Sequence, residues 1–379
     1  DAVGSEPLPD DIPAQPPTTL AIGADAPDFV LPGVDEEIYT LASFEGAEVL
    51  MVVFTCNHCP DAQLAEASLK QIAEDYADRS FAMVAISSNN PLAIRPDELG
   101  YSVHGDSFED MKHHAEDNAF NFPYLYDGAT QEVGRAYGGL SSPHCFVFDS
   151  DRKLRYTGRI NNLHRASDEL TDTPARDAIE AIYAGEEVAV PVTRAFGCTT
   201  KWLFKIARVA ADEEAWQNKP VTIEPIDSDA VAALAANDTE KLRVFNVWAT
   251  TCGPCIVEMP DLVLVNRNYQ NRPFEMITIC TDPADESDGA LAILEDSHAA
   301  LGRTAARTVG DEGRTTNNYI WDGGELDALA EALDAEWAGP LPYTVVIAPG
   351  GEVLYRHTGE ADIVELRHAI VDYLGRYWP

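Results

Sequence analysis

The sequence lacks any apolar run of about 18 residues, the length that a membrane-spanning helix needs. Basic residues are also scarce: 26 Lys and Arg stand against 64 Asp and Glu, which gives a formal net charge of −38. Proteins that bind nucleic acids or anionic membranes present a basic footprint, so this composition argues against both. The apolar fraction of 45% is that of a globular protein. We therefore expect no nucleic-acid partner and no transmembrane segment in this chain.

Cysteine is rare as well, but four of the seven cysteines form two Cys-x-x-Cys pairs. Cys56 and Cys59 follow one apolar run, and Cys252 and Cys255 follow another. A buried strand that ends in such a pair and leads into a helix is typical of a redox-active site. The helix N-terminus offers unpaired N–H groups and a positive dipole end, which favour thiolate over thiol. We predict that Cys56 and Cys252 are the nucleophiles and that Cys59 and Cys255 resolve the mixed disulfides.

A proline landmark follows each pair. Pro143 and Pro342 each open an apolar run, and the spacing from Cys56 to Pro143 nearly equals that from Cys252 to Pro342. A proline at the first position of a strand cannot donate a hydrogen bond to the neighbouring strand. The repeat predicts an internal duplication of architecture: an α/β fold of two tandem domains, each with a central mixed β-sheet flanked by helices.

These landmarks divide the chain into four parts. Residues 1–19 are rich in Pro and acidic residues, and we predict a disordered or extended tether. Residues 20–202 and 221–379 form the two domains, and residues 203–220 form a helical linker. The principal strands are expected at 48–54, 81–87, 242–248 and 276–280, the helices after the pairs at 61–76 and 256–269, further helices at 285–301 and 364–377, and a surface insertion at 89–107.

The second half resembles exported thioredoxin-like proteins of the ResA and TlpA type. The stretch Trp248–Pro260, sequence WATTCGPCIVEMP, carries this resemblance. It implies that Glu258 shuttles the proton of the resolving thiol, because a partly buried carboxyl with a raised pKa suits that role. Two departures are Thr251, where the family usually has Trp, and Asn246, where cytosolic thioredoxins carry a buried Asp.

The first half resembles a bacterial redoxin family, AhpC/TSA-related, that is akin to peroxiredoxins. The resemblance spans residues 22–202 and is carried by FTCNHCP at 54–60, by Pro143-His144, by LRYTGRI at 154–160 and by GCTTKW at 197–202. Peroxiredoxins place a Thr three residues before the peroxidatic Cys. Val53 stands three residues before Cys56, so that signature is missing. In the thioredoxin family the landmark proline is cis and packs against the Cys pair, and Pro143 and Pro342 match its place.

The two pairs differ in the residues between the sulfurs. His58 favours the thiolate and so the reduced form, which makes the first disulfide more oxidising. Pro254, in the same slot of the second pair, carries no charge. The chain is thus expected to hold two sites at different potentials, the first being the stronger oxidant.

The remaining cysteines and histidines have competing interpretations. Cys198 is a candidate third redox thiol, or else structural. Cys145 and Cys280 lie on apolar strands and are expected to be inert core. His144 either faces the active-site region or is a satisfied core histidine. His113 and His114 are expected on a solvated helix face, and no metal-ligand spacing is found near the first pair.

The leading hypothesis is a thiol-disulfide oxidoreductase with protein thiols and disulfides as partners and a membrane electron donor as a further candidate. It requires no organic cofactor and no metal. One alternative is a thiol peroxidase whose second domain reduces the first. Another is a copper-binding metallochaperone that uses the thiols and His58. Because the sequence starts at Asp1 and not at Met, we expect a removed N-terminus and an exported, extracytoplasmic protein, either periplasmic or membrane-tethered.

Overall fold

The computed structural model describes residues 13–378, which divide into two compact units. Unit 1 contains residues 13–95, 104–210 and 376–378, whereas unit 2 contains residues 96–103 and 211–375. The predicted domains were continuous stretches, and they did not anticipate these two short segments. Residues 13–19 belong to no helix or strand, and the first part of the predicted tether lies outside the described residues. No described helix is long and apolar enough to cross a membrane.

Unit 1 is built on a five-stranded mixed sheet. The described residues of unit 1 contain nine strands in all, of which β1 with β2 and β6 with β9 form two small separate sheets. The strands are β1 (Val30–Pro32), β2 (Ile38–Thr40), β3 (Val49–Phe54), β4 (Phe81–Ser87), β5 (Tyr124–Tyr126), β6 (Ser141–Ser142), β7 (His144–Phe148), β8 (Leu154–Gly158) and β9 (Cys198–Thr199). The sheet order is β5-β4-β3-β7-β8, with β3, β4 and β5 parallel and β7 and β8 antiparallel. Because β3 is central and buried along its whole length, it is a continuous apolar run in the sequence.

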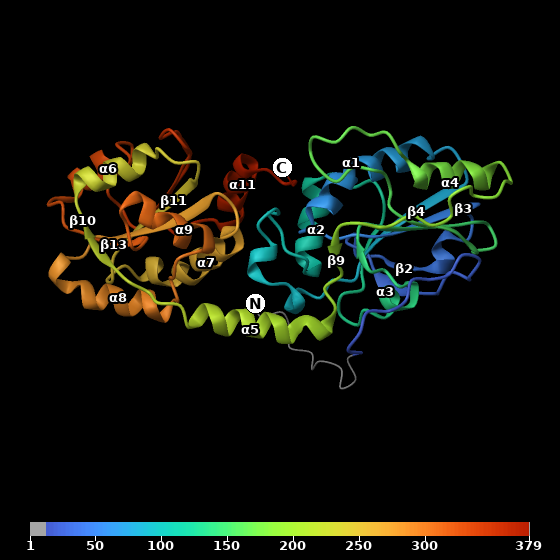
Figure 1. The fold of residues 1–379 in the computed structure, drawn as a ribbon, viewed down its shortest axis with the longest axis horizontal. Helices are drawn as coiled ribbons and strands as arrows, with labels where there is room; N and C mark the ends of the chain where they lie inside the picture. The colour runs from blue at the N-terminus through green and yellow to red at the C-terminus, as the bar shows by residue number, and fades with distance from the viewer. Residues whose placement is uncertain (1–12, 379) are drawn as a thin grey trace. The chain divides into compact units, whose positions relative to one another are not determined.

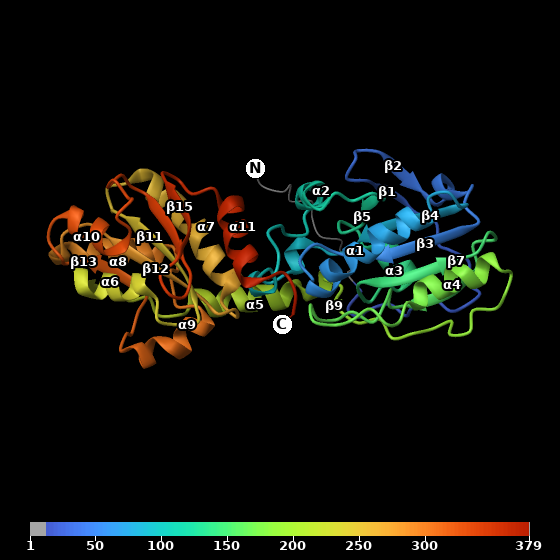
Figure 2. The same cartoon turned by 90° about the horizontal axis from the view of Figure 1, so that it is seen from above.

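Helices cover both faces of this sheet, which is blue to green in Figures 1 and 2. These helices are α1 (Pro60–Asp75), α2 (Phe108–Asp117), α3 (Glu132–Tyr137) and α4 (Pro174–Tyr183). After β9 follows α5 (Ile206–Gln217), which begins in unit 1 and ends in unit 2. Alternate residues of β3 point to opposite faces. Val49, Met51 and Val53 pack in the cluster that includes α1, α2 and α4, whereas Leu50, Val52 and Phe54 pack in the cluster that includes α3.

Unit 2 repeats the plan with one more strand. Its elements are β10 (Glu224–Ile226), α6 (Ser228–Ala236), β11 (Leu242–Trp248), α7 (Gly253–Tyr269), β12 (Phe274–Cys280), α8 (Ser287–Asp296), α9 (Arg303–Thr308), β13 (Asn318–Trp321), α10 (Leu326–Leu333), β14 (Tyr343–Ile347), β15 (Val353–Thr358) and α11 (Ile363–Leu374). The sheet order is β10-β13-β12-β11-β14-β15. Apolar residues of α6 and α10 share one core cluster with this sheet, and residues of α7 and α11 share another (Figure 2).

Both units therefore have a mixed sheet between helices, and each carries its Cys pair where the central strand meets a helix. This is the thioredoxin-like arrangement, twice in one chain. Two predicted helices are shorter than expected. The helix predicted over 285–301 is only α8. The helix predicted over 364–377 ends at Leu374, because Gly375 has a φ of +84° that ordinary residues avoid. In addition, β13 was not predicted.

The predicted surface insertion at 89–107 is also wrong. Four of its polar residues are nearly fully buried: Asn89, Ser102, His104 and Asp106. They can be buried because hydrogen bonds replace the lost contact with water. Asp106, for example, accepts two hydrogen bonds from the backbone N–H groups of Asn57 and His58, at 3.0 and 3.1 Å.

Candidate functional site

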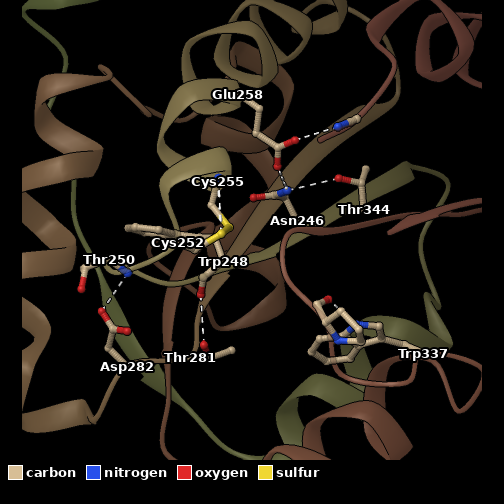
Figure 3. The surroundings of a disulfide bond; sticks show 12 residues. Asn246, Trp248, Thr250, Cys252, Cys255, Glu258, Thr281, Asp282, Trp337 and Thr344 are labelled. Carbon is tan, nitrogen blue, oxygen red and sulfur yellow. Dashed lines mark hydrogen bonds between the residues drawn. A yellow bond between two sulfur atoms is a disulfide. The ribbon is translucent and has the colours of Figure 1, made fainter. Parts of the chain in front are cut away.

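The second Cys pair, site 2, lies at the start of α7. Cys252 is the N-cap of this helix, and its Sγ accepts the N–H of Cys255 at 3.3 Å. Cys252 and Cys255 form a disulfide, shown in yellow in Figure 3. Cys255 is buried, whereas Cys252 is partly exposed and Gly253 and Pro254 are exposed. The outer sulfur of this disulfide is therefore the accessible one.

Two apolar side chains close to site 2 in the sequence are exposed. Ile256 and Val257, on the first turn of α7, are 37% and 67% exposed. The Leu341–Pro342 bond is cis, which confirms the conformation implied for Pro342 by the resemblance. β14 begins at the next residue and pairs with β11, so Pro342 lies near the end of the strand that leads to Cys252. The cis proline and the start of α7 thus lie at the same end of β11.

Glu258 stands one helical turn beyond Cys255, with its carboxylate directed at Asn246 (Figure 3). Its oxygens accept from Asn246 Nδ2 at 2.9 Å and from the N–H of Ala361 at 2.8 Å. Burial raises the pKa of Glu258 despite these two hydrogen bonds. Asn246 also donates to Thr344 Oγ1 at 3.1 Å, so the residue that replaces the thioredoxin Asp serves to hold the carboxyl in place. The geometry suits the proton-transfer role, which stays a prediction.

The first Cys pair, site 1, is arranged differently. Cys59, the second cysteine, is the N-cap of α1, whereas Cys56 lies in the preceding loop. Cys56 is 2% exposed and Cys59 is 0% exposed. Both sulfurs are described as free thiols. The helix terminus therefore acts on Cys59 and not on Cys56, which was the predicted nucleophile.

Cys59 is in contact with a strand from much later in the sequence. Its Sγ lies 3.1 Å from the carbonyl oxygen of Ser142 and 3.2 Å from the backbone N of Cys198, which donates to it. Burial alone would raise the pKa of Cys59, but hydrogen bonds from the thiols of Cys198 and Cys56 and the charge of His58 hold it well below the usual range. Burial raises the pKa of Cys56 instead. The thiolate of site 1 is favoured at Cys59.

His58 is held by a buried carboxylate. Its Nδ1 lies 2.7 Å from Asp106 Oδ2, which also accepts from Asn89 Nδ2 at 2.6 Å. Burial would raise the pKa of Asp106, but the charge and hydrogen bonds of His58 hold it below the usual range. Sequence reasoning missed Asp106, because it lies about fifty residues beyond the pair in a segment without periodicity. Two consecutive N–H groups with no helical partner are the local reason that a carboxylate is needed there.

Asp61 is a second residue that was missed. It is 3% exposed and lies two residues past Cys59, at the start of α1. Its carboxylate contacts His164 Nδ1 and accepts from Trp378 Nε1 at 3.0 Å. Burial and the charge of Cys59 raise the pKa of Asp61. Site 1 therefore has a buried carboxyl near its inner thiol, as site 2 has in Glu258, although the offset along the helix differs.

The other candidate residues resolve as follows. Cys145 and Cys280 are both 0% exposed, which confirms that they are core. His144 is a satisfied core histidine: Nδ1 accepts from the N–H of Leu140, Nε2 pairs with Thr157, and burial lowers its pKa to about 4. The expectation of a solvated face was wrong for His114, because that side of α2 packs inward.

His114 Nε2 lies 2.6 Å from Glu66 Oε1 of α1, whereas His113 is exposed. Pro143, the residue before β7, follows a cis bond from Ser142, as the resemblance implied.

One group in site 1 could hold a metal ion. Ligand atoms of Cys56, His58 and Asp106 lie within 4.8 Å of one another. His58 Nδ1 and Asp106 already bind each other, however, and the buried Nε2 of His58 is left without a hydrogen-bond partner. Only one thiol belongs to this group, whereas copper(I) prefers several soft sulfur ligands. The geometry thus gives the metallochaperone alternative little support.

Two family models match the chain: AhpC/TSA family over residues 22–157, and Redoxin over residues 228–370. No curated protein matches it.

Among solved structures, a hypothetical protein from Sinorhizobium meliloti is 33% identical, covers 49% of this chain and 96% of its own, and has a TM-score of 0.44. An uncharacterized conserved protein from Geobacillus kaustophilus is 33% identical, with coverages of 48% and 92% and a TM-score of 0.43. A thiol-disulfide oxidoreductase from Bacteroides fragilis is 20% identical, with coverages of 35% and 89% and a TM-score of 0.29.

The two family matches fall in different halves of the chain, and each half contributes one Cys pair at the junction of a central strand and a helix. The chain is therefore a tandem thioredoxin-fold protein, with an AhpC/TSA-family domain in its N-terminal half and a Redoxin-family domain in its C-terminal half.

Proposed function

We propose that this protein is a thiol-disulfide oxidoreductase that exchanges disulfides with protein substrates through its two Cys-x-x-Cys sites. The observation that carries the proposal is the Cys252–Cys255 disulfide at the exposed start of α7, beside Pro342. The exposed apolar residues Ile256 and Val257 on the first turn of α7 suit a segment of protein chain better than a small polar molecule.

In the reduced protein, the Cys252 thiolate attacks a substrate disulfide and forms a mixed disulfide, while one substrate thiolate leaves and takes up a proton. Cys255 then gives its proton to Glu258 and attacks the sulfur of Cys252. The disulfide of site 2 forms again, and the second substrate sulfur leaves as a thiolate. Two electrons pass from the protein to the substrate, and the reverse sequence oxidises a dithiol.

A trapping experiment tests this proposal. Reduced full-length Cys255→Ser protein is mixed with insulin, a protein that contains disulfides, because without Cys255 the mixed disulfide cannot be resolved. We expect an adduct linked through Cys252 that dithiothreitol releases. The matched variant Cys252→Ser should form no such adduct at this site. Equal yields in both variants, or no adduct in either, would contradict the proposal.

A thiol peroxidase is the second candidate, and the position of Cys59 favours it. Cys59 caps α1 and has a lowered pKa, which is what attack on a peroxide requires. Steady consumption of hydrogen peroxide in the presence of dithiothreitol, lost in Cys59→Ser, would support this candidate. No consumption above that of a Cys59→Ser, Cys252→Ser double variant would exclude it.

A further inference from the structure

The strand directly before Pro143 is paired with another segment of the same chain. β9 pairs antiparallel with β6, and in this pairing Cys198 is opposite Ser142, the residue directly before the cis proline. In the proposed function this edge is where an extended substrate segment would pair. Among residues 13–378 no strand pairs with Leu341, the residue before the cis proline of site 2.

The approach of β9 to this edge depends on Gly197. Its φ is +130°, a conformation that other residues rarely adopt, and a Cβ there would lie 2.0 Å from the carbonyl oxygen of Ser142. Next along the chain, the N–H of Thr200 donates to the carbonyl oxygen of Leu140 at 3.1 Å. The segment is thus held on both sides of Cys198, in a position that only glycine permits.

Cys198 packs against the two cysteines of site 1. Its thiol hydrogen-bonds to Cys59, and its backbone N–H lies 3.2 Å from the same sulfur. Cys56, Cys59 and Cys198 form one cluster. Cys198 is the partly exposed member of this cluster, whereas Cys56 and Cys59 are buried. A reagent from solution therefore meets Cys198 first.

We propose that Gly197–Thr199 is a built-in substrate strand and that Cys198 is a third exchange thiol, through which external disulfides and thiols reach the buried Cys56/Cys59 pair. This inference rests on the proposed disulfide exchange at site 1. It adds that no extended peptide pairs with β6 at site 1, because β9 already pairs with it.

The three thiols of the cluster and one external disulfide account for every bond and proton in the exchange. Cys198 passes its proton to the Cys59 thiolate and attacks an external disulfide RSSR, which releases RS⁻ and leaves Cys198 as a mixed disulfide. Cys59 then passes that proton to RS⁻ and attacks the Cys198 sulfur, which releases the second RS⁻ and forms Cys59–Cys198. Finally Cys56 attacks Cys59 and gives its proton to Cys198, so that Cys56–Cys59 forms and Cys198 is a thiol again.

The test uses the full chain with Cys252→Ser and Cys255→Ser, so that only site 1 reacts. Reduced protein is exposed to oxidised glutathione, quenched with N-ethylmaleimide at timed intervals, and digested without reduction for mass spectrometry. We expect Cys59–Cys198 peptides at early times and Cys56–Cys59 peptides later. Adding Cys198→Ser should slow the appearance of Cys56–Cys59 by at least ~10-fold, because no accessible sulfur remains. Cys145→Ala, which removes a buried thiol outside the cluster, should change nothing.

Two outcomes would overturn the inference: Cys56–Cys59 forming equally fast without Cys198, or Cys198 remaining fully alkylated by the quench at all times. In the first case site 1 still exchanges disulfides, so the proposed function survives. If no thiol of site 1 is oxidised, the function of that site fails together with the inference. Adduct formation by Cys252 in a separate preparation with only Cys255→Ser then decides whether the proposed function stands at site 2.

Discussion

The two Cys pairs share a spacing but begin their helices at different residues. α7 is capped by the first cysteine of its pair, Cys252, and α1 by the second, Cys59. In site 2 the capping sulfur is partly exposed and the inner one is buried. In site 1 the capping sulfur is itself buried, beneath β9. The same spacing therefore places a different cysteine of each pair at the start of its helix.

This comparison also separates the two sites by access. Residues 55–60 are all buried, whereas Gly253, Pro254 and Val257 are exposed. The loop at Asp106 and the strand β9 both belong to unit 1 and cover its Cys pair. Site 2 has exposed residues beside its outer sulfur, whereas in our proposal site 1 is reached through the chain's own thiol. The following predictions would break or sharpen this contrast.

The largest expected effect is on alkylation. In the fully reduced protein at neutral pH, iodoacetamide should modify Cys252 at least ~100-fold faster than Cys56 or Cys59, because the two buried thiols react only when the structure opens locally. Timed quenching and peptide mass spectrometry measure the rates. Cys145, buried in the core of unit 1, gives the baseline for opening. Equal alkylation rates at Cys59 and Cys252 would contradict the inferred difference in solvent access between the two sites.

Displacing β9 should reduce the difference in alkylation rate between Cys252 and Cys59. Gly197→Ala places a Cβ against the carbonyl of Ser142, so we expect alkylation of Cys59 to rise by ~10-fold as the strand detaches. Gly185→Ala is a matched control, because Gly185 also has a positive φ, +67°, but a Cβ there would meet nothing within 4 Å. If both variants expose Cys59 equally, general destabilisation and not the strand is responsible.

The two buried carboxyls should act each on its own site. Glu258→Gln should slow disulfide exchange at Cys252 by ~10-fold or more, because the proton of Cys255 loses its acceptor. Burial raises the pKa of Glu258, so its carboxylate fraction, and with it the exchange rate, should grow as pH rises through that pKa. The variant should lack this rise. The rates of disulfide exchange at Cys252 are measured over a range of pH, by fluorescence or by timed chemical quenching, in the unmodified protein and in the variant.

Asp61→Asn is the counterpart in unit 1. It should slow exchange at site 1 by a similar factor and leave Cys252 unaffected, since the raised pKa of Asp61 reflects burial and the nearby Cys59. Slowing of both sites by either variant would indicate general damage and not proton transfer at one sulfur.

The smallest effect concerns reduction potential. We expect site 1 to be the stronger oxidant by tens of millivolts, since each 30 mV corresponds to ~1.4 kcal/mol of thiolate stabilisation in this couple. His58→Gln should narrow the gap by removing the imidazole while keeping the N–H that Asp106 accepts. Redox titration of single-site Cys→Ser variants measures both values. A site 1 more reducing than site 2 in the unmodified protein would contradict the expected order of the two potentials.

Local patterns predicted the regular elements well and the site only in part. β4 and β11 have the predicted bounds, because each is an apolar run between clear breaks. The two cis prolines came from a resemblance and were confirmed. Asp106 and Trp378 could not be predicted, since their roles depend on contacts between residues far apart in the sequence.

The same limit explains the thiolate at Cys59. Its lowered pKa depends on Cys198 and His58 together, and only the second of these is its neighbour in the sequence. The spacing of the motif therefore predicts a redox pair but does not order its two sulfurs.

Residues 376–378 belong to unit 1, and their place at the end of the sequence determines when unit 1 is completed during synthesis. Trp378 and Arg376 contact Asp61 and Gln63 at the start of α1, yet a ribosome synthesises them only after all of unit 2. At ~5–20 residues per second, that delay is on the order of ten seconds or more. During this interval the buried carboxyl beside Cys59 lacks its indole partner, so the N-terminal domain emerges first but is completed last.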